Sequence, residues 1–468
     1  MAKMQVSKFK EYITEAKEGK PFLRLLIITD EPEEAKTFHT ADRLREEADK
    51  KGYKNYLYKL SGGYMTLEDG IRRVHNKDDE KGFEISAETT VAVIRGSITR
   101  KDSWMDLVSQ LEKAGIVCVN SRQTISTCAD KYRTALRLSD VGLRQPKTVL
   151  VSDPDNIQKD FEKLDTDFPI ILKTLRGSKG VGVLFVESEK SLMSLVQVLY
   201  KQDEDTDLLL QEYIKTDYDA RVHVLGGKVL TAMRRDVLEG DFRSNISQGA
   251  KAKTLQLTKL EIEKCLEAAK AVGGIWTGVD FIPSKNREKD EPFFIEVNSS
   301  PGTEGVEEAT KRNVSKEIIE YFEDRDNWVH VPTECGFKEI IKLGGLELVA
   351  KFDTGNSGQN VIHGKDIKVE GKKVSWKLLD KRYSANVVRM DNIKVGGLRD
   401  YDEDRPLIKL DVEFAGTIYN DVLFTIDDRE DRTPILLDRK FMKRLNVMVN
   451  PAQKYLLTTP FNIDIRKA

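Results

Sequence analysis

The sequence predicts a fold in three parts: an α/β domain, then an α+β domain, then a mainly β domain. Up to about residue 120, apolar strands alternate with amphipathic helices. Strands, hairpins and helices then follow to about residue 330, and short Val-, Ile- and Leu-rich strands separated by Gly, Asn and Asp turns fill the remainder. The length of 468 residues also suggests about three domains.

Composition and charge exclude several classes of protein. Lys and Arg number 76 against 78 Asp and Glu, and a formal net charge of -2 gives no reason to expect nucleic-acid binding. No apolar run approaches the ~18 residues of a membrane span, and the N-terminus lacks the apolar core of a signal peptide. The four cysteines are too far apart for a zinc knuckle or a disulfide framework. We therefore expect a cytoplasmic globular protein with neither a membrane nor a nucleic acid as partner.

A short amphipathic lead-in helix is expected within residues 1–20, before an α/β domain at 21–120. In this domain we expect the strands at 23–29, 53–59, 90–95 and 116–119, the helices at 33–51 and 104–114, and a polar insertion before the third strand. Such alternation is typical of a parallel sheet. No Gly-x-Gly-x-x-Gly follows the first strand, so a Rossmann dinucleotide fold is not supported.

The second domain is expected at residues 121–330. Its expected elements are helices at 129–140, 259–272 and 317–324, strands at 147–151, 170–173 and 208–213, and a hairpin at 220–233. Lys173 ends one strand and precedes a glycine-rich loop whose backbone N–H groups can approach an anion closely. The predicted phosphate loop comprises Gly177, Ser178, Gly180 and Gly182. It is not a Walker A loop, and an ordinary glycine-rich hairpin is the alternative interpretation.

Two further strands, at residues 276–282 and 292–298, predict a magnesium site. Side chains alternate along a strand, so Glu296 and Asn298 project to one side, and Asp280 joins them if the two strands pair. Two carboxylates and an amide oxygen are the hard ligands that Mg²⁺ prefers. A polar loop beside a turn is the alternative for Glu-Val-Asn taken alone.

Polar residues also gather between these two regions. Residues 211–214, Gln-Glu-Tyr-Ile, end a strand with polar groups beside an aromatic ring, as a hinge holding adenine and ribose would. Asp219 and Arg221 follow, then Arg234, Arg235 and the segment 241–245. Arginines suit charge-assisted contacts with carboxylate and phosphate oxygens. Ordinary surface ion pairs are the alternative.

Taken in order, these motifs resemble those of RimK-type ATP-grasp ligases, the alpha-L-glutamate ligase family. The matching motifs are Asp-Lys-Tyr-Arg-Thr at 130–134, Lys173 with its loop, 211–214, Asp-Ala-Arg at 219–221, Phe-Arg-Ser-Asn at 242–245, Gly-Val-Asp at 278–280 and Glu-Val-Asn-Ser-Ser-Pro-Gly at 296–302. The resemblance covers about residues 121–323, and the α/β domain before it resembles a pre-ATP-grasp domain. One departure, residues 246–251 in place of a His and a Gly pair, leaves the acceptor substrate open.

The resemblance implies a carboxylate–amine ligase that depends on ATP and Mg²⁺, with Mn²⁺ able to substitute. A substrate carboxylate would attack the γ-phosphate, and an amine would convert the acyl phosphate to an amide. The donor would be a carboxylate such as an amino acid, the acceptor an amine or a protein or peptide tail, and the protein a homo-oligomer. For the nucleotide, the resemblance implies phosphate binding by Lys131 and Lys173, adenine and ribose binding by Glu212, Tyr213 and Asp219, and further contacts from Arg243, Ser244 and Asn245. It implies catalysis by Arg243 and Asn245 and substrate binding by Arg221 and Arg234. The implied metal ligands are Asp280, Glu296 and Asn298.

The third domain, at residues 335–462, contains an apolar strand that leads into Asp353-Thr-Gly, and later a Leu-Leu-Asp-Arg segment at 436–439. Together these resemble the retropepsin-like proteins, also labelled ATP-dependent zinc proteases or RimB-like, in which Asp353 would be catalytic. Retropepsins use two Asp-Thr-Gly turns that share a proton, and this chain has one. Asn356 and Asp438 also depart from the pattern. A peptide-binding or inactive scaffold is the alternative for this domain, and an aspartic peptidase or a non-catalytic ATP-sensing protein is the alternative for the whole chain.

Overall fold

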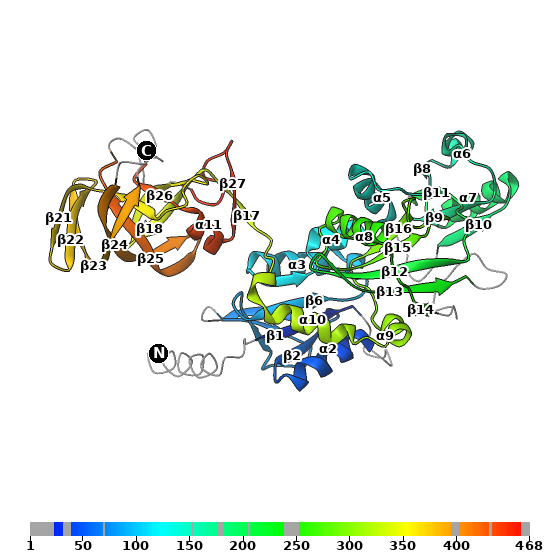
Figure 1. Ribbon diagram of the computed structural model, residues 1–468, viewed down its shortest axis with the longest axis horizontal. Coiled ribbons are helices and arrows are strands. Elements are labelled where there is room, and N and C mark those ends of the chain that lie inside the picture. The colour runs from blue at the N-terminus through cyan, green and yellow to red at the C-terminus, as the bar shows by residue number, and fades with distance from the viewer. Residues whose placement is uncertain are drawn as a thin grey trace. The chain divides into compact units, whose positions relative to one another are not determined.

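The computed structural model describes residues 23–30, 39–68, 71–151, 153–175, 182–204, 206–237, 252–394, 402–429 and 433–459. The chain divides into two compact units, Met1–His330 and Val331–Ala468 (Figure 1). Some predicted features lie outside the described residues: the lead-in helix, Gly177, Ser178, Gly180, Arg243, Ser244 and Asn245. None of the helices in the described ranges has the length and apolar character of a membrane span.

A four-stranded parallel sheet, in the order β2-β1-β6-β7, opens the first unit and confirms the expected α/β pattern. Its elements are β1 (Arg24–Thr29), α2 (His39–Lys50), β2 (Lys54–Lys59), β6 (Thr90–Ile94), α3 (Asp102–Lys113) and β7 (Val117–Val119). Alternate residues of β1 enter different cores: Leu25 and Ile27 pack on the side of Leu44 in α2, and Leu26 and Ile28 on the side of α3. Both faces are covered, which is why the strands are continuous apolar runs.

The expected polar insertion is itself a small antiparallel sheet, β3-β4-β5. Its strands are β3 (Tyr64–Glu68), β4 (Ile71–His75) and β5 (Phe83–Ile85). Val74 and Ile85 bury their side chains in the α3-side core, so apolar anchors hold this otherwise polar segment on the domain.

A four-stranded antiparallel sheet follows, in the order β10-β9-β11-β8. The elements of this part are α4 (Arg122–Cys128), α5 (Lys131–Asp140), β8 (Thr148–Val151), α6 (Ile157–Leu164), β9 (Ile170–Thr174), β10 (Val183–Val186), α7 (Glu189–Gln202) and β11 (Leu208–Glu212). Leu172 and Leu210 pack with Val196 of α7 in one buried cluster. Strands β9 and β11 pair antiparallel with Lys173 opposite Leu209, so the Lys173 side chain shares a sheet face with Gln211, two residues further along β11.

A five-stranded antiparallel sheet, in the order β14-β13-β12-β15-β16, completes the α+β part. Its elements are β12 (Tyr218–Leu225), β13 (Lys228–Asp236), β14 (Ala252–Thr254), α8 (Lys259–Ala271), β15 (Trp276–Ile282) and β16 (Phe293–Asn298). Val222, Val279 and Val297 pack against Cys265 and Ala268 of α8. Because this face is apolar and covered, the alternate residues of the same strands project from the opposite face.

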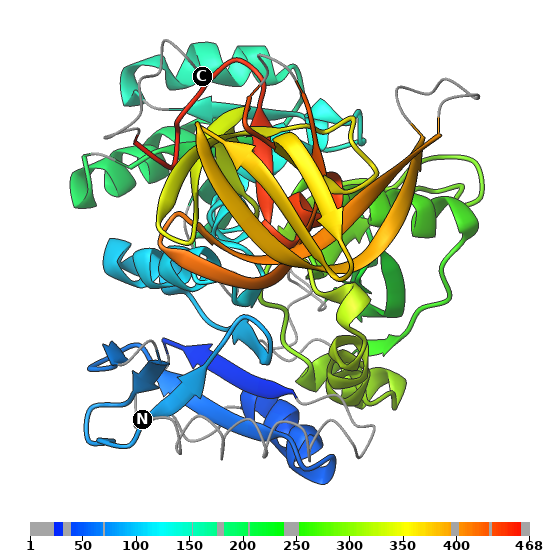
Figure 2. The same cartoon turned by 90° about the vertical axis from the view of Figure 1, so that its left-hand side faces the viewer.

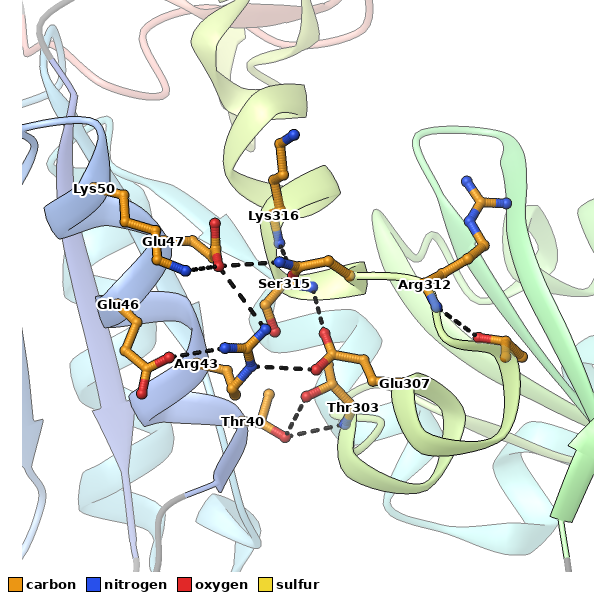
Figure 3. Close-up of polar contacts among 12 residues, drawn as sticks. Thr40, Arg43, Glu46, Glu47, Lys50, Thr303, Glu307, Arg312, Ser315 and Lys316 are labelled. Atoms are coloured by element: carbon orange, nitrogen blue, oxygen red, sulfur yellow. Dashed lines mark hydrogen bonds and ion pairs between the residues drawn. The ribbon is translucent and has the colours of Figure 1, made fainter.

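Contacts at three points, among others, join the parallel-sheet domain to the segment that follows β16, where α9 (Glu304–Thr310) and α10 (Val314–Glu323) begin. Figure 3 shows the contact with α2, in which the Thr303 backbone N–H donates to Thr40 Oγ1 at 3.0 Å and Arg43 Nε donates to Glu307 Oε2 at 3.4 Å. The backbone N–H of Gly96 donates to Ser300 Oγ at 3.2 Å.

Asn120 makes the third contact. Its Nδ2 donates to the carbonyls of Trp276 at 2.6 Å and Ser299 at 2.7 Å, and its Oδ1 accepts from the N–H groups of Ile275 at 2.7 Å and Trp276 at 3.1 Å. The residue is fully buried. Asn120 therefore ties the start of β15 to the loop after β16.

The second unit is mainly β, as expected, and its strands close into a barrel (Figures 1 and 2). The barrel strands are β18 (Lys338–Leu343), β19 (Leu346–Phe352), β20 (Asn360–His363), β24 (Asp402–Phe414), β25 (Thr417–Asp427) and β26 (Ile435–Leu437). Closure follows because β18 pairs with both β19 and β24. The remaining elements are β17 (Thr333–Gly336), β21 (Lys365–Glu370), β22 (Lys373–Leu378), β23 (Lys381–Lys394), α11 (Arg439–Leu445) and β27 (Val447–Asn450).

The four hydrogen bonds of the Asn120 side chain predict how its removal affects stability. Asn120→Ala should lower the free energy of unfolding of the first unit by about 3 kcal/mol or more, since each buried backbone group left unpaired costs about 1–3 kcal/mol. Asn286→Ala, at an exposed asparagine of the same unit, is the matched control and should change it by less than about 0.5 kcal/mol. Urea unfolding followed by tryptophan fluorescence measures both. Equal stability of the two variants would contradict a stabilising role for the Asn120 hydrogen bonds.

Candidate active site

The predicted metal ligands share one face of the five-stranded sheet. Strands β15 and β16 pair as the expected antiparallel hairpin, with Asp280 opposite Glu296 and Gly278 opposite Asn298. Residues directly opposite in an antiparallel pair share a face, as do residues two apart in one strand. Asp280, Glu296 and Asn298 therefore project together, away from the apolar face that α8 covers.

Two arginines hold the Asp280 carboxylate on that face. Arg221, opposite Asp280 on β12, donates from Nε to Oδ1 at 2.7 Å and from Nη2 to Oδ2 at 2.5 Å. Arg235 on β13 donates from Nη2 to Asp280 Oδ2 at 2.9 Å. Burial alone would raise the pKa of Asp280, but the two guanidiniums outweigh it and hold that pKa below its ordinary value. The carboxylate is thus kept ionised in a buried position.

Arg235 also joins Asp280 to Asp219. It donates from Nε to Asp219 Oδ1 at 2.6 Å and from Nη2 to Oδ2 at 2.7 Å. All three side chains are buried. Asp219 was expected to bind adenine and ribose. In the structure, Arg235 connects its carboxylate to that of Asp280. Its role toward the nucleotide stays a prediction.

The donor set fits a hard divalent cation such as Mg²⁺. Glu296 keeps a side chain that is 39% exposed, and its Oε1 lies 4.0 Å from Arg221 Nη2. Asn298 Nδ2 is buried and has no hydrogen-bond partner among the described residues. The candidate ligands are two carboxylates and one amide oxygen; the described residues contain no cluster of three His, Cys, Asp or Glu side chains that could hold a metal. Asp280 Oδ1 accepts one arginine hydrogen bond and retains a further lone pair, whereas Oδ2 accepts two.

Lys131 begins α5, and Lys173 lies on β9 of the four-stranded sheet. Lys173 Nζ donates to Gln211 Oε1 at 2.6 Å, and Lys131 Nζ donates to the Thr174 carbonyl at 3.2 Å. Burial lowers the pKa of both amines, to about 8 for Lys173, while the charge of Glu296 acts on both in the opposite direction. The structure therefore brings the two predicted phosphate-binding lysines within electrostatic reach of Glu296.

The predicted adenine hinge lies at the end of β11, beside Lys173. The backbone N–H of Lys147 donates to Glu212 Oε2 at 3.1 Å, and the Tyr213 ring meets Phe185 edge-on at 5.1 Å between centroids. One member of the predicted phosphate loop is described. Gly182 has φ +79°, and a Cβ there would lie 2.3 Å from Thr174 Oγ1, so the end of this loop needs glycine.

Arg234 is separated from the other predicted substrate residue, Arg221. It pairs with Ala220, stacks its guanidinium 4.0 Å from the Tyr218 ring centre and donates from Nε to Asp236 Oδ1 at 2.7 Å. Neighbouring residues of a strand point to opposite faces, so Arg235 joins Asp280 while Arg234 points away. Arg235 was not among the predicted site residues. Alternation along β13 puts these two successive arginines on opposite faces of the sheet, but it does not say which of them faces Asp280.

These features define an ATP-grasp fold, and comparison with known proteins agrees. Residues 128–322 match the RimK-like ATP-grasp domain. A solved structure, a Chryseobacterium gregarium RiPP-associated ATP-grasp ligase in complex with ADP and a leader and core peptide, superposes with a TM-score of 0.51 at 17% identity, over 66% of this chain and 100% of that chain.

The probable alpha-L-glutamate ligase of Psychromonas ingrahamii is 33% identical over 290 residues, 62% of this chain and 92% of the relative. That of Methanococcoides burtonii is 32% identical over 292 residues, 62% of this chain and 93% of the relative. The chain belongs to the RimK-like ATP-grasp ligase family.

The lowered pKa of Lys173 predicts how nucleotide affinity depends on pH. Because the amine loses its charge as pH rises through about 8, affinity for Mg²⁺·ATP should be level below that pH and fall by up to about tenfold per pH unit above it. Lys173→Arg, whose side chain stays charged, should remove this fall. Calorimetric titration from pH 6.5 to about 9.5 measures it. The same profile for the parent and Lys173→Arg would exclude Lys173 from phosphate binding.

Proposed function

We propose that the protein is a carboxylate–amine ligase that uses ATP and Mg²⁺ to form an amide through an acyl phosphate. One observation carries the proposal: oxygen donors Asp280, Glu296 and Asn298 share a sheet face within electrostatic reach of Lys131 and Lys173. Phosphoryl transfer needs positioning and charge neutralisation more than a protein nucleophile. Membership of the RimK-like ATP-grasp ligase family supports the same chemistry.

Each group has a definite task in this reaction. The lysines neutralise phosphate charge, and Arg221 and Arg235 orient the Asp280 carboxylate. Asp280, Glu296 and Asn298 would hold Mg²⁺, which supplies positive charge to the transferred phosphoryl group. A substrate carboxylate oxygen bonds to the γ-phosphorus as the bond to ADP breaks; the amine nitrogen then bonds to the acyl carbon, phosphate leaves and the amine loses a proton. Catalysis by Arg243 and Asn245 stays a prediction.

We propose an amino acid and a peptide or protein tail as the two substrates. The relatives from Psychromonas and Methanococcoides are named probable alpha-L-glutamate ligases, and the Chryseobacterium ligase is bound to a leader and core peptide. Glutamate is accordingly the first amino acid to test. Mn²⁺ should replace Mg²⁺, and a homo-oligomer is expected. An ATP-sensing protein, the alternative, would bind the nucleotide without consuming it.

The metal assignment predicts the effect of removing Glu296. Glu296→Ala should lower ATP turnover to ADP by about 10²-fold or more, because charge neutralisation at the transferred group is lost. Glu308→Ala, at an exposed glutamate of α9, is the control and should retain parental turnover. ADP release is measured with Mg²⁺, L-glutamate and a peptide extract. Near-parental turnover by Glu296→Ala would remove Glu296 from the metal site.

A second candidate function, peptide-bond hydrolysis, is favoured by the position of Asp353 in the second unit. This residue follows β19, its N–H donates to the Leu437 carbonyl on the parallel strand β26 at 3.2 Å, and its Oδ1 accepts from the Gly355 N–H at 3.0 Å. Asp438, one of the two departures from the retropepsin pattern, has a structural explanation: its buried carboxylate accepts from the Phe441 N–H at 2.6 Å and caps the N-terminus of α11. We propose that two copies would have to meet for a carboxylate dyad, since each chain has one Asp-Thr-Gly.

The peptidase proposal has its own test in Asp353→Asn. This variant should abolish peptide cleavage and leave ATP turnover unchanged, whereas Asp380→Asn, at an exposed aspartate of the same unit, should retain both. Cleavage of a fluorogenic peptide library, with sedimentation to determine the oligomeric state, measures the outcome. Parental cleavage by Asp353→Asn, or cleavage by a monomer, would exclude a retropepsin-type dyad.

A further inference from the structure

The parallel sheet of the first unit contains a topological switch point, where the strand order reverses, and no residue there has a role in the proposed reaction. From β1 the chain continues to β2 on one side, whereas β6 lies on the other side of β1. Ligands of open α/β sheets bind outside the carboxyl ends of the strands at such a point. Here the carboxyl ends carry Asp30 after β1, and Arg95 and Gly96 after β6. This position therefore has the topology of a ligand site.

Asp30 brings a buried carboxylate to this point. Its side chain is 2% exposed, and Oδ2 is buried without a hydrogen bond among the described residues. Its counter-ion is Arg100, whose Nη2 lies 3.1 Å from Oδ2 and whose side chain is 68% exposed. A buried carboxylate short of hydrogen bonds is costly unless a cation satisfies it. An exposed arginine is a cation that a ligand can displace.

Gly96 makes room for this carboxylate. Its φ is +83°, and a Cβ there would lie 1.6 Å from Asp30 Oδ1. The N–H of the same glycine donates to Ser300 Oγ at 3.2 Å. Ser300 is two residues beyond Asn298, so their Cα atoms are at most about 7.6 Å apart. Asp30 thus lies beside the loop that leaves the predicted metal site.

We propose that Asp30 binds the ammonium group of the amino-acid substrate, in the place that the Arg100 guanidinium holds in this structure. The inference rests on the proposed ligase function and names a subsite for one of its substrates. An ammonium group offers three donors, which suits the unsatisfied Asp30 oxygen together with the Ser300 hydroxyl. A carboxylic acid of the same skeleton without the amino group would lack these contacts.

The test compares each standard L-amino acid with the carboxylic acid of the same skeleton that lacks the amino group. Binding is measured by calorimetry on the full chain with Mg²⁺ and the ATP analogue AMPPNP. The parent should bind at least one amino acid about tenfold or more tighter than its counterpart, as expected for a charge-assisted contact. Asp30→Asn should lose this preference, and the control Asp102→Asn, at an exposed aspartate of the same domain, should keep it.

Arg100→Ala should keep the preference or strengthen it, because the competing cation is gone. Three results would each contradict ammonium binding by Asp30. They are weaker amino-acid binding by Arg100→Ala, a preference retained by Asp30→Asn, and no preference in the parent. Parental AMPPNP affinity in Asp30→Asn would show that its fold and nucleotide site are intact. A parent that binds no AMPPNP would instead overturn the proposed ligase function, and the subsite with it.

Discussion

The active-site face depends on one buried bridge, in which Arg235 joins Asp219 to Asp280. A carboxylate buried alone would take up a proton, and a protonated Asp280 could not serve as an anionic metal ligand. Arg235 and Arg221 prevent this by compensating the charge with hydrogen bonds of fixed geometry. Removing one member of such a network leaves an uncompensated charge, which typically costs about 3–5 kcal/mol. Stability and the chemistry of the site are therefore linked at Arg235.

The parallel-sheet domain contacts the segment after β16, which directly follows the predicted metal ligand Asn298. Asn120 follows β7, Gly96 follows β6 and Thr40 lies in α2, and each contacts a residue within 299–303. Asn298 directly precedes this segment, so the same contacts restrict where its amide can lie. The first domain thus has a positioning role in addition to the substrate role that we infer for Asp30.

Much of the fold followed from residue patterns, because strand alternation and helical periodicity are local. The hairpin of Asp280 with Glu296 followed in the same way, since it needs only the pairing of two neighbouring strands. Helix α7 was missed although Leu192, Val196 and Tyr200 recur every four residues on its buried side. Which arginine of β13 binds Asp280 depends on the register between two strands, and this was not predicted from the sequence. The register between β12 and β13 shifts between His223 and Val224, and this shift decides that Arg235, not Arg234, lies opposite Asp219.

A crystal structure with Mg²⁺ and AMPPNP tests the central claim most directly. The account predicts a metal ion within about 2.1 Å of oxygen atoms of Asp280, Glu296 and Asn298. It also predicts that the terminal phosphates lie between that ion and the amines of Lys131 and Lys173. A metal ion bound elsewhere, or phosphates held away from both lysines, would contradict the assignment of this sheet face as the site of phosphoryl transfer.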